Sequence, residues 1–137
     1  MTLILPDTNA WIKLLNPGDS LVKIRFREAD PQALRLCAVV KAELYYGACK
    51  SPRRAQNLAL LERLFATYPS LPFEDAAANV YGDIRAKLET AGNPIGPHDL
   101  MIAAIALATS AVLVTHNTRE FGRIPGLQYA DWELPSA

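Results

Sequence analysis

Short apolar runs alternate along this chain with segments of helical periodicity. The apolar runs lie at residues 3–5, 36–39 and 112–114, and a last short run lies at 128–130. In the segments between them, apolar residues recur every three or four positions. Alternation of this kind is typical of parallel strands that are connected by helices. The pattern therefore predicts an α/β fold with a short parallel sheet.

Six helices are expected between the apolar runs, together with a short edge strand near 69–73. Ser51 is expected to cap one helix, with Pro52 at its first helical position. Gly92 is expected to end another helix, because glycine readily adopts the left-handed conformation of a helix terminus. The predicted helices begin near Asn9, cover 20–28, run through Glu43 and Tyr46, begin at Pro52, cover 75–91 and begin at Pro97.

The amino-acid composition is that of a chain with enough hydrophobic residues to form a core and with equal numbers of basic and acidic residues. Hydrophobic residues make up 50% of the chain, and 14 basic residues match 14 acidic ones. Disorder is therefore not expected, and no overall field draws the protein onto nucleic acid. No repeat or long linker divides the sequence, so we expect one domain over residues 1–137.

Neither disulfides nor a membrane anchor are expected. Cys37 and Cys49 are too few for a disulfide framework or a zinc site. The N-terminus lacks the basic region of a signal peptide. The longest apolar stretch, residues 100–114, is shorter than the roughly 20 residues that a spanning helix needs. We expect a cytoplasmic protein without membrane contact.

Three acids occupy positions that call for a chemical explanation. Asp7 directly follows the first apolar run, and open α/β sheets form their sites at the carboxyl ends of strands. Glu43 lies, on a helical wheel, in the middle of an arc where a carboxylate is costly to bury without compensation. The other residues of this arc are Val39, Val40, Leu44, Tyr46 and Gly47. Asp99 is the third residue of an apolar helix.

Each acid also has an ordinary structural interpretation, which the sequence leaves open. Asp7 is a good N-cap for the helix that follows it. Glu43 could pair with an arginine or with helix N–H groups. Asp99 lies where free N–H groups and the helix dipole favour an anion.

Taken together, the acids indicate a metal-dependent hydrolase. Converging carboxylates repel one another, and a cation removes that repulsion. Ligand sets made only of oxygen select hard ions, so Mg²⁺ or Mn²⁺ is expected. Such ions activate water and neutralise the charge that develops on a phosphodiester.

At these residues the sequence resembles the PIN-domain nucleases, and most closely the VapC toxins of bacterial toxin–antitoxin pairs. The resemblance extends from Leu3 to Trp132 and includes four blocks in order: LPDTNAWI, VVKAELYYGACKS, IRAKLETAGNPIGPHDLMIAAIA and VTHNTREFGRIPGLQYADW. It implies a three-layer α/β/α sandwich and an endoribonuclease. It also implies metal binding by Asp7 and Asp99, with Glu43 as a further acid of the catalytic site.

The resemblance extends to residues around the acids. Asn117 matches a position where many PIN domains carry a fourth acid, and an amide there would hold a water or the substrate. Thr8, Asn9 and Thr115 are expected to orient the acids through hydrogen bonds. Arg85 has three open interpretations: contact with substrate phosphate, neutralisation of a carboxylate, or a solvated helix charge.

The family also implies partners. These are a small VapB-like antitoxin whose C-terminal segment covers the site, and a second copy of the chain in a homodimer. The RNA substrate implied by the most similar toxins is tRNA, in particular the anticodon loop of initiator tRNA.

Two other kinds of protein, a non-hydrolytic signalling receiver and a phosphatase, fit the sequence less well. A phosphorylation-controlled receiver needs a lysine after a late strand, and Thr115, His116 and Asn117 follow residue 114 here. A phosphatase that forms an aspartyl-phosphate needs a second Asp two residues after the first, where this chain has Asn9. A catalytically inert interaction module stays open, because Asn117 replaces an acid.

Overall fold

The computed structural model describes residues 1–135 and contains a short parallel sheet at its centre. Its strands are β1 (Ile4–Pro6), β4 (Val112–Val114) and β5 (Tyr129–Ala130), in the order β1-β4-β5. A second parallel pair, β2 (Leu36–Cys37) with β3 (Ser70–Leu71), lies next to β1. The apolar runs therefore form strands as predicted.

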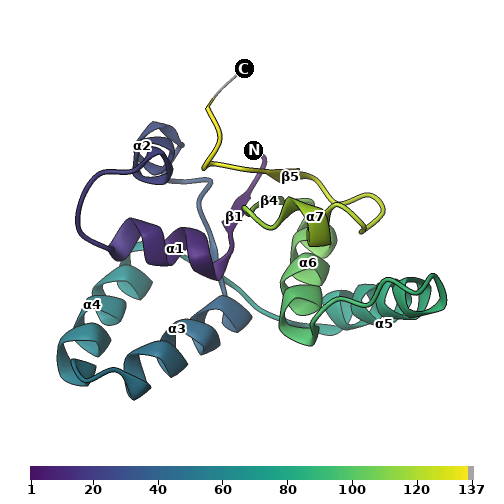
Figure 1. Cartoon of the computed structure of the whole chain (residues 1–137), viewed down its shortest axis with the longest axis horizontal. Helices are drawn as coiled ribbons and strands as arrows, with labels where there is room; N and C mark the ends of the chain where they lie inside the picture. The colour runs from purple at the N-terminus through teal and green to yellow at the C-terminus, as the bar shows by residue number, and fades with distance from the viewer. Residues whose placement is uncertain (136–137) are drawn as a thin grey trace.

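Helices cover both sides of the sheet. Figure 1 shows one group to the left of β1 and another group to the right of β4. This arrangement confirms the predicted α/β class with helical layers on either side of a short parallel sheet. The first group is α1 (Thr8–Leu15), α2 (Leu21–Glu28), α3 (Ala38–Lys50) and α4 (Arg54–Thr67); the second is α5 (Asp75–Thr90), α6 (Pro97–Thr109) and α7 (Thr118–Phe121).

The core lies where α6 and the sheet meet. Ile102 and Ile105 of α6 and Leu5 and Leu113 of the strands are almost completely buried. On the other side of the sheet, the Trp11 ring lies 4.9 Å from that of Phe26, measured between ring centroids. Packing on both sides fixes the positions of the strand ends, and hence of any side chains that follow them.

Several predicted boundaries shift. Helix α4 begins at Arg54 rather than at Pro52, because the Ser51 hydroxyl accepts from the Arg53 N–H at 3.1 Å and makes a turn instead of a helix cap. Strand β2 ends at Cys37 rather than at residue 39, since α3 already begins at Ala38. Helix α7 was not predicted.

Other expectations hold. Gly92 follows α5 with a φ of +76°, a left-handed conformation that ends the helix as predicted. Both cysteines are free; Cys37 is buried and Cys49 is exposed. Within residues 1–135, no helix is long and apolar enough to cross a membrane.

Replacing Leu113 by Ala should destabilise the fold strongly. Leu113 is fully buried in the middle of β4, so the change leaves a cavity and should lower the free energy of unfolding by about 3 kcal/mol. Leu134→Ala is the matched control, because that side chain is 55% exposed and its loss should cost less than about 0.5 kcal/mol. Urea unfolding measures both; equal values for the two variants would contradict the assigned core.

Candidate active site

Three polar side chains follow the aligned ends of the parallel strands. Asp7, Thr115 and Asp131 come directly after β1, β4 and β5. The Asp7 N–H donates to the Val114 carbonyl at 2.8 Å, and the Thr115 N–H donates to the Ala130 carbonyl at 2.9 Å. The sheet therefore places these residues side by side at its carboxyl edge.

Asp7 is both a helix cap and a buried carboxylate. Its Oδ1 accepts from the Ala10 N–H at 2.9 Å, and the residue is only 8% exposed. Burial raises the pKa of Asp7, opposed by hydrogen bonding from Ala10 and Thr115. Repulsion from Glu133 and Glu43 raises it further. The capping bond fixes the orientation of a carboxylate whose charge is unfavourable at this position.

Glu43 reaches the site from α3. The Thr8 hydroxyl, at the start of α1, donates to Glu43 Oε1 at 2.6 Å. The expectation that Glu43 lies in a buried apolar arc is only partly right, because Tyr46 is 67% exposed and Gly47 is also exposed. This face of α3 instead lines an open groove of about 410 Å³ between α1, α3 and α4.

Asp99 lies half-buried in the first turn of α6. Burial raises its pKa to about 6, and repulsion from Glu120, Glu43 and Asp7 adds to the effect. His98 opposes this shift. Within residues 1–135, no backbone N–H donates to the Asp99 carboxylate, so the capping interpretation of this acid is not supported.

Glu120 is a fourth acid that the sequence reasoning missed. It lies in α7, where its Oε2 accepts from the Asn117 amide at 2.8 Å and its Oε1 accepts from the Gly96 N–H at 3.3 Å. The carboxylate therefore lies at the start of α6, close enough to Asp99 to raise its pKa. An Asn followed three residues later by Glu is typical of a helix start, and that pattern could have revealed α7.

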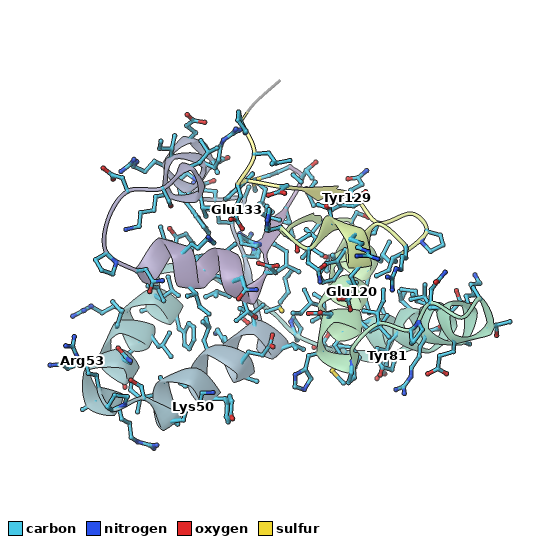
Figure 2. All side chains as sticks on the ribbon, in the orientation of Figure 1. Lys50, Arg53, Tyr81, Glu120, Tyr129 and Glu133 are labelled. Atoms are coloured by element: carbon cyan, nitrogen blue, oxygen red, sulfur yellow. The ribbon has the colours of Figure 1, made fainter. Side chains whose placement is uncertain are left out.

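A further group adjoins Asp7 on its other side. Within residues 1–135, ligand atoms of His116, Asp131 and Glu133 lie within 4.8 Å of one another. His116 Nδ1 lies 2.9 Å from Asp131 Oδ2, within hydrogen-bonding distance, and Lys13 Nζ forms a salt bridge of 3.1 Å with Glu133 Oε1. Figure 2 shows Glu133 between α1 and the C-terminal segment. The strand-end rule that identified Asp7 would also have found Asp131.

The residues expected to orient the acids differ in the contacts that they make. Thr8 contacts Glu43 directly, as described. Thr115 is buried, and its hydroxyl accepts from the Asn117 N–H at 3.0 Å, which fixes the loop after β4. Asn9 is exposed beside Asp7. The hydrogen bond from Asn117 to Glu120 gives that amide an orienting contact.

Arg85 lies on α5 and pairs within its own helix. Its guanidinium donates to Glu89 Oε1 at 3.0 Å and to the Tyr81 hydroxyl at 2.8 Å. Figure 2 labels Tyr81 on α5, to the right of α6. Arg85 therefore neutralises Glu89 rather than an acid of the site, and a contact with substrate stays a prediction.

The four acids carry the ligand atoms that a hard cation prefers, although within residues 1–135 only His116, Asp131 and Glu133 bring three ligand atoms within 4.8 Å of one another. Asp7, Glu43, Asp99 and Glu120 supply only oxygen atoms, which hard cations prefer. The raised pKa values of Asp7 and Asp99 show that these carboxylates resist ionisation in the protein alone. A bound cation would reverse that effect, because it favours the charged form of a nearby carboxyl.

A model of the PIN domain matches residues 4–127, which include all four acids. The chain belongs to the PIN domain family. It is 38% identical over 132 residues to the tRNA(fMet)-specific endonuclease VapC of Shigella flexneri, covering 96% of this chain and 99% of the relative. It is 35% identical to ribonuclease VapC2 of Rickettsia felis, covering 93% and 96% of the two chains.

Solved structures agree with these PIN-domain relatives. A chain of the DNA-bound VapBC structure from Salmonella typhimurium aligns with a TM-score of 0.89 and 36% identity, covering 96% of this chain and 99% of that one. A chain of VapBC2 from Rickettsia felis, bound to a promoter fragment, aligns with a TM-score of 0.88 and 31% identity, covering 96% and 99%. The expected VapC resemblance, fold and ribonuclease class are confirmed.

Asp99 should make the metal-free PIN domain less stable as the pH rises. Its pKa is about 6 in the folded chain against an ordinary value of 3.8 for an aspartate in water. Between these values the folded state keeps a proton that the unfolded state has released, so its contribution to stability is complete below 3.8 and is lost as the pH rises through about 6. The loss should be about 2 kcal/mol after allowance for solvent screening.

Urea unfolding with a chelator, at pH values on either side of this window, measures the effect. Asp99→Asn should lack this part of the pH dependence because its amide does not titrate. Identical pH profiles for the variant and the unchanged chain would show that Asp99 titrates normally.

Proposed function

We propose that this PIN-domain chain is a Mg²⁺-dependent endoribonuclease that acts as the toxin of a toxin–antitoxin pair. The observation that carries the proposal is the convergence of Asp7, Glu43, Asp99 and Glu120 at the carboxyl end of the sheet. Burial raises the pKa of Asp7 and Asp99, and repulsion from neighbouring acids raises it further. Carboxylates that resist ionisation in the protein alone are expected where a bound cation would favour their charged form.

Each acid has a separate role in the proposal. Asp7 and Asp99 hold the metal: Asp7 is held by the Ala10 N–H at the end of β1, and Asp99 lies in the first turn of α6. Glu43, held by Thr8, binds the metal or orients the attacking water. Glu120 accepts a hydrogen bond from Asn117 and adds a fourth carboxylate beside Asp99. When bound, the cation would lower the pKa of water and neutralise charge on the phosphodiester.

We propose tRNA as the substrate, in particular the anticodon loop of initiator tRNA. Support comes from two relatives that are named tRNA(fMet)-specific endonucleases, from Shigella flexneri and Salmonella typhimurium, at 38% and 36% identity. Cleavage of tRNA would place the activity in the cytoplasm.

Purified chain with Mg²⁺ should cut initiator tRNA at discrete positions and leave elongator methionine tRNA largely intact. Chelator should abolish the cuts, and Asp7→Asn or Asp99→Asn should lower the rate by about 100-fold or more, because each variant removes a metal ligand. Asp83→Asn is the matched control, since Asp83 is exposed on α5 and pairs with Lys87. Gel analysis of end-labelled tRNA measures all variants.

Two outcomes would count against the proposal. Full activity of Asp99→Asn would remove the assigned metal site. Intact RNA under every condition, from folded protein that gains no thermal stability with Mg²⁺, would favour the inert interaction module.

We further propose that the antitoxin segment lies in the groove between α1, α3 and α4. The groove is lined mainly by apolar residues, including Ile12, Leu44 and Leu61, and Glu43 lies at its boundary with the acids. An apolar segment with an arginine at its end would satisfy both features. The solved VapBC structures support a VapB-like partner for this chain. The homodimer stays a prediction.

Gly47→Trp should weaken antitoxin binding by about 100-fold. Gly47 lines the groove, and a Cβ at this position meets nothing within 4 Å, so a large side chain there occupies the groove without disturbing the fold. Gly82→Trp is the control, because Gly82 is equally open on α5. Calorimetric titration with the cognate antitoxin measures both; equal affinities would place the antitoxin elsewhere.

A further inference from the structure

An open pocket of about 550 Å³ adjoins the acids beside Asp7. This volume lies within the usual range for small-molecule sites. Its α1 wall carries residues spaced at i, i+3, i+4 and i+7, which share one helix face. The α1 residues are Asn9, Ile12, Lys13 and Asn16, and the facing wall comes from His116 and Asn117 after β4.

The charges of this pocket do not favour a phosphate. Lys13 is paired with Glu133 at 3.1 Å, and His116 is paired with Asp131 at 2.9 Å. The remaining unpaired charge at the inner edge is the Asp7 carboxylate, which repels an anion. The pocket therefore suits a polar group without charge.

The hydrogen-bonding groups of the pocket match the edge of a nucleobase. Asn9 and Asn16 are exposed, and within residues 1–135 their side-chain amides have no hydrogen-bond partner. A side-chain amide offers both donors and an acceptor, the combination that reads base edges. Ile12 is 39% exposed, and the His116 side chain is 60% exposed. These two side chains offer an apolar surface and a ring on which an unpaired base can stack.

We propose that this pocket holds the base and ribose of the unpaired nucleotide next to the scissile phosphate. The inference rests on the proposed ribonuclease activity and assigns the subsite that gives it base preference. Asp7 joins the two sites, because it lines the pocket and belongs to the acidic cluster. A phosphate at the acids therefore directs its own nucleoside into the pocket.

Binding is tested first with the four nucleoside 5′-monophosphates, each compared with inorganic phosphate. In NMR spectra of the ¹⁵N-labelled chain with Mg²⁺, one or two nucleotides should shift the side-chain amide signals of Asn9 and Asn16. Inorganic phosphate should leave these signals in place. Equal shifts with phosphate alone, or no shift with any nucleotide, would overturn the proposal.

Cleavage is tested with Asn16→Ala and His116→Ala. Loss of one base contact should raise KM for tRNA by about tenfold, leave kcat within about twofold and change the base preferred at the cleavage site. Asn16→Ala removes an amide without a protein partner, so its fold should be unaffected even if His116→Ala unfolds. Gln32→Ala is the control, because Gln32 is exposed and lies outside this pocket.

The outcomes separate this inference from the proposed function. An unchanged chain that cuts no RNA would refute the ribonuclease itself. An active chain in which Asn16→Ala keeps its KM and base preference would refute only the nucleotide pocket. Loss of antitoxin affinity in both variants, with cleavage unaltered, would make the pocket part of the partner surface and would also refute it.

Discussion

Electrostatic repulsion among carboxylates at one edge of the sheet is the constraint on which this site depends. Asp7, Glu43, Asp99 and Glu120 come from four different parts of the fold. Burial raises the pKa of Asp7 and Asp99, and repulsion from the neighbouring acids adds to this effect. The charged forms of Asp7 and Asp99 would be more stable in water. The fold nevertheless holds them together, because the free energy of burying α6 and the strands around Leu5 and Leu113 outweighs the cost of the charges.

Neighbouring polar groups keep the acids oriented without neutralising them. Thr8 donates to Glu43, Ala10 donates to Asp7, and Asn117 donates to Glu120. No arginine or lysine pairs with these four carboxylates within residues 1–135. Lys13 pairs with Glu133 and Arg85 pairs with Glu89 instead, while His98 Nδ1 lies 3.9 Å from Glu43 Oε2 and balances that charge only when it is protonated. The negative charge is thus left for a metal ion to balance.

Helix α1 connects this cluster to the groove and the pocket that are proposed to recognise the antitoxin and the RNA. Asp7 caps the helix, and its exposed face lines both the groove beside α3 and the pocket beside the β4 loop. Ile12 and Asn16 belong to both surfaces. In the proposed function, antitoxin and RNA therefore meet on one helix, and occupation of the groove by the antitoxin would also affect the nucleotide pocket.

The sequence by itself determined the strands, most helices and three of the acids, because each leaves a local signal. Asp7 follows an apolar run, and Asp99 follows Pro97 at the start of an apolar helix. The helical wheel singled out Glu43 on the expectation that its face of the helix is buried, which is only partly right. Periodicity distinguishes the faces of a helix but does not reveal whether another element covers them. Only the tertiary structure decided the rest. Glu120 joins the site because β5 pairs with β4 and α7 packs against β5, and such long-range contacts follow from the packing of the whole core rather than from neighbouring residues.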